Sequence, residues 1–174
     1  SPLTLTTEIR TGSPPIPNPL PAVAWRIGID LDPIDLDDPE AVRWARALLW
    51  PEQLDRIARF ETAVALVRPD PPRIVRGNAL EVLPGILAQA PPDATPVVFH
   101  SFVLNQFTPG GRERFDAMLR DLSSERSIHR VSIEMLRTDM AFPEVHHTEY
   151  RRGKAEERLL GEAHHHGAWL AWAE

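Results

Sequence analysis

The chain has 174 residues, enough for one domain of ordinary size, and its 43% hydrophobic and 25% charged residues are typical of a folded globular protein. Its net charge of −6 argues against a general polyanion-binding surface, and the absence of cysteine excludes disulfides, cysteine zinc sites and thiol nucleophiles. No apolar run reaches transmembrane length. We therefore expect a cytoplasmic protein that binds neither nucleic acid nor membrane.

The first half of the chain predicts one strand followed by helices. Apolar and polar side chains alternate over residues 3–10, which is typical of a strand. Residues 12–24 form a proline-rich connector, since proline lacks the N–H donor that helices and central strands need. Asp38 and Pro39 form a typical helix start. Helices are expected from there to residue 50 and over residues 51–68.

The second half predicts strands that alternate with helices. Residues 96–100 are a continuous apolar run, as in a strand that is buried on both faces, and a hairpin turn is expected at Gly153-Lys154. In chain order we expect strand 73–75, helix 79–90 bent or restarted at Pro84, strand 96–100, helix 109–122, strand 131–135 and a hairpin of 146–152 with 157–172.

This alternation predicts an α/β fold, a three-layer Rossmann-like domain with a mostly parallel sheet and a C-terminal antiparallel hairpin. Neither an internal repeat nor a second domain is evident, so residues 1–174 are expected to form a single domain.

Residues 75–80, Val-Arg-Gly-Asn-Ala-Leu, resemble the Gly-Asp-Ala turn after the third strand of class I S-adenosylmethionine-dependent methyltransferases. The resemblance implies that Asn78 stands where an acidic residue binds the adenine amino group, and an asparagine oxygen can also accept that hydrogen bond. If the strand over residues 3–10 is the second strand of such a sheet, Glu8 at its end would bind the ribose.

A second resemblance covers most of the chain. Its motifs are Arg26–Asp30, Trp50–Gln53, Phe99–Ser101 and His164 to Trp169, in this order. They are similar to an uncharacterised bacterial family, domain of unknown function 2332. Members of that family carry an upstream Gly-Ala-Ser-Ala-Gly loop, so this chain is expected to be a C-terminal fragment without the first strand of the full fold. The same resemblance marks Asp30 as a candidate cofactor residue.

His100 and Ser101 are the candidate catalytic residues, because they end the predicted buried strand. Ligands of α/β sheets bind at the carboxyl ends of parallel strands. We expect His100 to line the principal cleft, on the same side of the sheet as Asn78. The alternative is a histidine whose ring caps neighbouring backbone carbonyls.

A histidine cluster precedes the C-terminus. If residues 164–166 form a strand, His164 and His166 share one face about 7 Å apart, a spacing that two metal ligands can use. A third ligand would be required. We favour polar packing on an edge strand, and no metal ligand is assigned.

The leading functional hypothesis is the C-terminal part of an S-adenosylmethionine-dependent methyltransferase-like protein of unknown substrate. S-adenosylmethionine is expected in the intact protein but not tightly bound to this chain, because none of its nine glycines forms a phosphate-type loop. The expected partners are a substrate and either the missing N-terminal portion or further copies of the chain. The alternatives are a non-catalytic Rossmann-like domain with an interaction or ligand-sensing role, and a metal-assisted hydrolase.

Overall fold

The computed structural model describes residues 2–173, which form two compact units. The first unit comprises Trp25–Val82 with residues 2–5, and the second comprises Thr6–Ala24 with residues 83–173. The single-domain expectation is not decided by this division and stays a prediction. None of the helices within residues 2–173 is both long and apolar enough to cross a bilayer.

The first unit contains two short parallel strands and two helices. The strands β2 (Gly28–Asp30) and β3 (Ile74–Arg76) pair in parallel, and β2 was not expected from the sequence. Helix α1 (Pro39–Ala47) begins as predicted, because the Asp38 carboxylate accepts the N–H of Glu40. Helix α2 (Leu54–Val67) follows.

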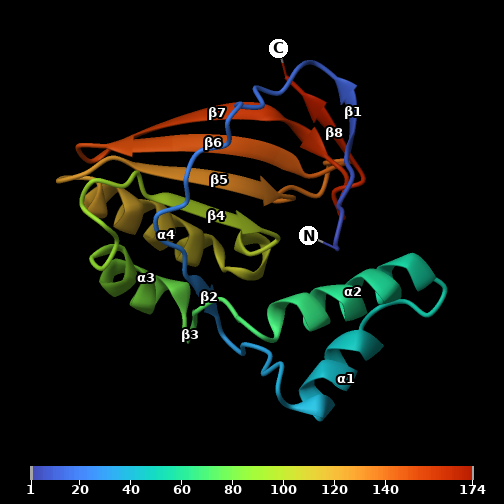
Figure 1. The fold of residues 1–174 in the computed structure, drawn as a ribbon. Coiled ribbons are helices and arrows are strands. Elements are labelled where there is room, and N and C mark those ends of the chain that lie inside the picture. Colours follow the sequence, from blue (N-terminus) through green and yellow to red (C-terminus); the bar gives the residue numbers. More distant parts are fainter. Residues whose placement is uncertain (1, 174) are drawn as a thin grey trace. The chain divides into compact units, whose positions relative to one another are not determined.

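The second unit is built on a mixed six-stranded sheet of order β1-β8-β7-β6-β5-β4 (Figure 1). Its strands are β1 (Glu8–Thr11), β4 (Val97–Ser101), β5 (Ile128–Glu134), β6 (Glu144–Arg151), β7 (Lys154–Ala163) and β8 (Trp169–Trp172). The pairs β1–β8 and β4–β5 are parallel, whereas the three pairs from β5 to β8 are antiparallel. The α/β class is therefore confirmed, but the mostly parallel sheet is not.

Strand β4 corrects another expectation, because it lies at the edge of the sheet and not at its centre. Phe99 is 81% exposed and Val97 is exposed beside it, so the β4 face that carries them is open. An apolar run is typical of a doubly buried strand. Here it instead gives an edge strand with one uncovered apolar face.

The C-terminal hairpin is present, with different boundaries. Arg151 pairs with Lys154, so the two turn residues are Arg152 and Gly153, both with positive φ (51° and 76°), one position earlier than expected. The segment expected as a single strand over 157–172 is divided into β7 and β8. Residues 12–24 contain neither helix nor strand, as predicted.

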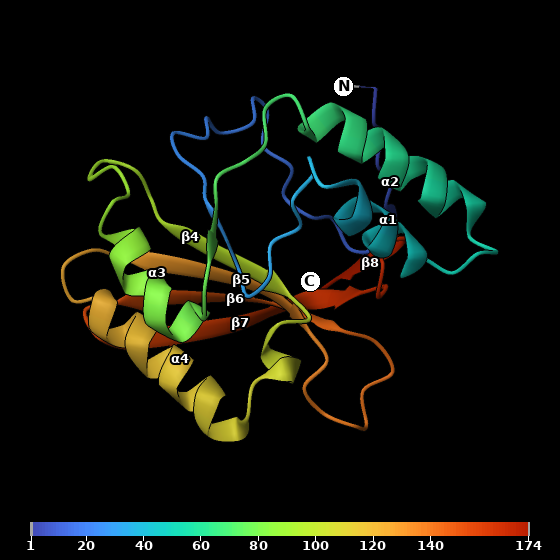
Figure 2. The same cartoon turned by 90° about the horizontal axis from the view of Figure 1, so that it is seen from below.

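Two helices complete the second unit. Helix α4 (Pro109–Leu122) has the predicted bounds, and its N-cap Thr108 accepts the N–H of Gly111. Helix α3 (Ala79–Leu87) crosses the boundary between the units at Leu83. Figure 2 shows α4 lying along one face of the sheet, where the fully buried Tyr150 of β6 donates a hydrogen bond to Asp116 of α4. This covered face carries the buried side chains of β5.

Candidate functional site

A buried histidine–glutamate pair lies at the carboxyl ends of the parallel strands β4 and β5. The Nδ1 atom of His100 is 2.7 Å from Oε1 of Glu134, and the two side chains are only 7% and 4% exposed. Because the strands are parallel and adjacent, their last residues lie side by side at the same end of the sheet. The second unit thus places an imidazole and a carboxylate in direct contact, sheltered from water.

The same carboxylate oxygen also holds the loop after β4. Oε1 of Glu134 accepts the backbone N–H groups of Val103 at 2.9 Å and Leu104 at 3.1 Å. Burial alone would raise the pKa of Glu134, but the hydrogen bonds from His100, Leu104 and Val103 outweigh it and hold the pKa below its ordinary value. Glu134 is therefore an ionised carboxylate that fixes both the imidazole and the loop.

The other ends of the pair are enclosed. His100 Nε2 and Glu134 Oε2 are both buried and have no hydrogen-bond partner within residues 2–173. The ring of Phe115 from α4 meets the His100 ring edge-on, with 5.8 Å between the ring centroids. Burying an unpaired polar atom costs about 1–3 kcal/mol. Neither atom is satisfied by a hydrogen bond from the described residues, so each could accept one from a polar group that reaches it.

Ser101 does not join this pair. Consecutive strand residues point to opposite faces, and Ser101 is exposed on the open face of β4 while His100 faces α4. In the sheet, His100 is paired instead with Ser132 of β5, and Ser132 with His146 of β6.

The histidine cluster lies in the turn between β7 and β8 and not on a strand. His164 Nδ1 accepts the backbone N–H of His166, which is a turn contact. Among the described residues, no group of three or more His, Cys, Asp or Glu side chains is arranged to hold a metal ion. The turn therefore does not supply the third ligand that the metal hypothesis needs.

This turn nevertheless lies at the same end of the strands as His100. Strand β7 runs in the direction of β5, because each is antiparallel to β6. The His165 ring stacks on Phe102, the second residue after His100, at a centroid distance of 6.1 Å. Phe102 has a φ of 54°, a left-handed conformation that costs a non-glycine residue about 1–2 kcal/mol. A strained segment thus follows the buried imidazole directly.

In the first unit, Asp30 is the last residue of β2, and Asn78 follows the carboxyl end of the neighbouring parallel strand β3. The N–H of Gly77 donates to the backbone oxygen of Asp30 at 2.8 Å, which joins the two segments. The Asn78 Oδ1 atom caps α3 by accepting the N–H of Leu80 at 3.0 Å. A Cβ on Gly77 would lie 2.7 Å from a methyl group of Val82, so this turn needs glycine. The sharing of one cleft by Asn78 and His100, which belong to different units, stays a prediction.

Glu8 is placed differently from its expected role. It is the first residue of β1 and not the last, because the strand covers Glu8–Thr11 instead of residues 3–10. Its carboxylate is exposed and lies 3.6 Å from Arg10. A residue at the amino end of a strand is not where α/β sheets bind ribose.

A second polar network lies under α4. Arg130 is buried and donates to Glu157 of β7 at 2.8 Å and to Thr148 of β6 at 3.0 Å. His146, on the same face, lies 2.9 Å from Glu144. These contacts join β5, β6 and β7 through side chains.

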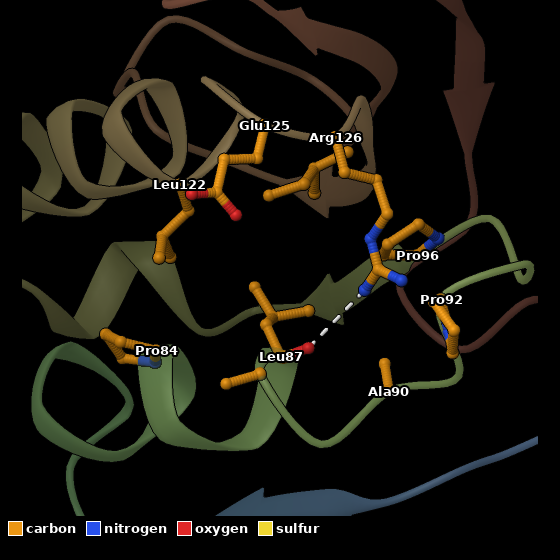
Figure 3. Close-up of a pocket in the computed structure, with 10 residues that line it drawn as sticks. Pro84, Leu87, Ala90, Pro92, Pro96, Leu122, Glu125 and Arg126 are labelled. Carbon is orange, nitrogen blue, oxygen red and sulfur yellow. Dashed lines mark hydrogen bonds between the residues drawn. The ribbon is translucent and has the colours of Figure 1, made fainter.

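A pocket of about 510 Å³ opens beside the amino ends of β4 and β5 in the same sheet (Figure 3). It is lined mainly by apolar side chains near the ends of α3 and α4 and near the starts of β4 and β5. The Arg126 guanidinium donates there to the backbone oxygens of Pro91 at 2.7 Å and Leu87 at 3.4 Å. Since these starts lie opposite the carboxyl ends, this pocket is separate from His100.

His100 was predicted from the sequence, but Glu134 was not. The signal was present, because Glu134 ends the strand that follows β4 and lies within the predicted segment 131–135. Only the parallel pairing of β4 and β5 shows that this carboxylate meets the imidazole.

Comparison with protein families matches residues 1–172 to a family described as uncharacterised protein conserved in bacteria, domain of unknown function 2332. Searches of curated proteins and of solved structures gave no match. The family match covers nearly all of the chain, including β2, β3 and the His100–Glu134 pair. The chain therefore belongs to the family of domain of unknown function 2332.

Proposed function

We propose that the chain is the C-terminal part of a cytoplasmic S-adenosylmethionine-dependent methyltransferase-like enzyme. The observation that carries the proposal is the hydrogen bond from the Gly77 N–H to the Asp30 backbone oxygen. It joins the carboxyl ends of β2 and β3, where Asp30 and Asn78 offer side chains that can bind a nucleoside. The role expected for Glu8 passes to Asp30 in this proposal, and the missing portion of the protein would supply the glycine-rich turn.

The first unit offers groups that fit an adenosine. Asn78 Oδ1 already accepts one N–H, but an amide oxygen has two lone pairs and can accept the adenine amino group as well. Asp30 Oδ1 accepts the N–H of Asp32 at 2.8 Å, which leaves its second oxygen for a ribose hydroxyl. The tight turn at Gly77 lets a ligand approach the backbone. These groups recognise the nucleoside, and the methyl group to be transferred comes from the bound S-adenosylmethionine.

The second unit offers a base. With its Nδ1 held by Glu134, His100 can take up a proton at Nε2, as a general base does. The carboxylate stabilises the imidazolium that results. A base in a sheltered site is what the deprotonation of a substrate nucleophile requires.

One observation favours the non-catalytic alternative. Asn78 is used as a helix cap, and His100 Nε2 is covered in this structure, so both side chains also have structural roles. A degenerate relative that keeps the fold would retain these contacts. Cofactor binding distinguishes the two hypotheses.

The test is calorimetric titration of S-adenosylhomocysteine into the intact protein, by which we mean this chain together with the N-terminal portion expected to precede it. We expect micromolar affinity and at least about tenfold weaker binding, roughly 1.4 kcal/mol, for Asn78→Ser and Asp30→Asn. Serine keeps the helix cap but is too short to reach a base, so Asn78→Ser separates the ligand contact from the cap.

Matched controls are Asn78→Asp, which keeps the acceptor, and Asp32→Asn, which changes a neighbour paired with Arg76. Both should bind within about threefold of the parent protein, less than about 0.7 kcal/mol. Absence of binding to the intact protein at millimolar ligand would favour the non-catalytic domain.

A further inference from the structure

We propose that Glu134 is the positioning residue of the site, and that the substrate presents an O–H or N–H group to His100 Nε2. The inference rests on the proposed function for the identity of the reaction. Its structural part rests on contacts within the second unit, namely one carboxylate oxygen that holds both the imidazole and the following loop.

Glu134 determines which nitrogen of His100 carries the proton. An ionised carboxylate can only accept hydrogen bonds, so the 2.7 Å contact with Glu134 requires the proton on Nδ1. In a neutral imidazole the other nitrogen then carries the lone pair. Glu134 therefore fixes Nε2 as the basic atom.

The basic Nε2 atom of His100 can take a proton from a substrate. When Nε2 takes a proton, the O–H or N–H bond of the substrate breaks, its electron pair stays on the substrate atom, and a new N–H bond forms on the ring. The positive imidazolium is paired with the Glu134 carboxylate. A nucleophile that carries no proton, such as a carboxylate, gains nothing from this arrangement. The site therefore favours a substrate whose nucleophilic atom carries a proton, as in an alcohol, a phenol or an amine.

Glu134 also couples the orientation of His100 to that of the loop after β4. The Val103 and Leu104 N–H groups share Oε1 with the imidazole, so one charge orders both. Phe115 covers the ring, and Nε2 is buried. The substrate must displace part of this cover to reach Nε2, while Glu134 keeps the ring in its orientation.

The experiment is nitrogen-15 NMR of the histidine rings in this chain, combined with amide hydrogen exchange. When its ring is neutral, we expect His100 to carry its proton on Nδ1, the nitrogen that contacts Glu134. Glu134→Leu should abolish this preference and speed exchange of the Val103 and Leu104 amides by about tenfold or more. Glu134→Gln, which keeps an acceptor oxygen but not the charge, should retain the tautomer and speed exchange less.

The control is Glu144→Gln, which changes the carboxylate that contacts His146 on the same face. It should leave the His100 ring signals unchanged. A His100 proton on Nε2 in the parent chain, or protection of the two amides unaffected in both Glu134 variants, would overturn the positioning role.

In the intact protein, Glu134→Gln should lower kcat about tenfold or more with KM nearly unchanged. If the NMR result holds but the intact protein does not bind S-adenosylhomocysteine, the positioning role stands and the proposed function fails. If the cofactor binds and His100 carries its proton on Nε2, the proposed function stands and this inference fails.

Discussion

Replacement of Tyr150 by phenylalanine tests how α4 is held on the sheet that carries His100. The Tyr150 hydroxyl donates to Asp116 Oδ1 at 2.7 Å, and the ring is fully buried. A hydrogen bond to a charged group contributes about 1.5–3 kcal/mol. Asp116 keeps its contact with Arg120 and is 33% exposed in its side chain, so part of this loss is recovered by hydration. We expect a loss of about 1.5–2 kcal/mol.

For a chain of this size, that loss corresponds to a decrease in melting temperature of roughly 3–8 °C. Thermal and urea unfolding followed by circular dichroism at pH 7 measure it. Asp116→Ala should cost more than Tyr150→Phe, because it leaves a buried hydroxyl unpaired, and the double variant should show a coupling of about 1–2 kcal/mol. Arg120→Ala should cost less than either. If the unfolding free energy of Tyr150→Phe lies within about 0.5 kcal/mol of the parent value, the hydrogen bond to Asp116 does not hold α4 on the sheet.

Two further predictions concern stability. The pKa of His147 is lowered by burial and then by the neighbouring charge of His129, so the folded state disfavours its protonation and loses stability as pH falls through about 6.5. His147→Gln should therefore weaken the dependence of the urea midpoint on pH between 7 and 5. An unchanged pH dependence would contradict this role of His147. A Cβ on Gly161 would lie 2.0 Å from the backbone oxygen of Ala171, so Gly161→Ala should lower the free energy of unfolding by more than about 3 kcal/mol. Gly153→Ala, with open space around it, should lower it by about 1–2 kcal/mol. Equal melting temperatures for the two variants would disprove this difference.

Helix α4 was predictable because its signals are local. Thr108 caps it, Pro109 occupies its first turn, and an apolar stripe runs along its buried side. The sheet was less predictable because pairing is not local. The alternation of apolar and polar residues in β6 and β7 does not determine the strand order. It therefore could not predict that β4 lies at an edge or that β1 pairs with β8.

The candidate site shows the same division. His100 could be found because a polar residue ended an apolar strand. Glu134 could not be assigned to it, because their contact depends on the register of two strands separated by α4. His164 and His166 were placed on a strand by extending the hairpin pattern, whereas β7 ends at Ala163.

Methyl transfer itself can be measured by incubating the intact protein with S-adenosylmethionine and an extract of bacterial metabolites, and quantifying the S-adenosylhomocysteine formed. We expect S-adenosylhomocysteine to form with the parent protein and with Asp32→Asn. With His100→Gln we expect about 100-fold less product or lower still, the effect of removing a general base, while S-adenosylhomocysteine binding is retained. Unchanged product formation in His100→Gln would rule out His100 as the base, and its absence from the parent protein would rule out the proposed methyl transfer.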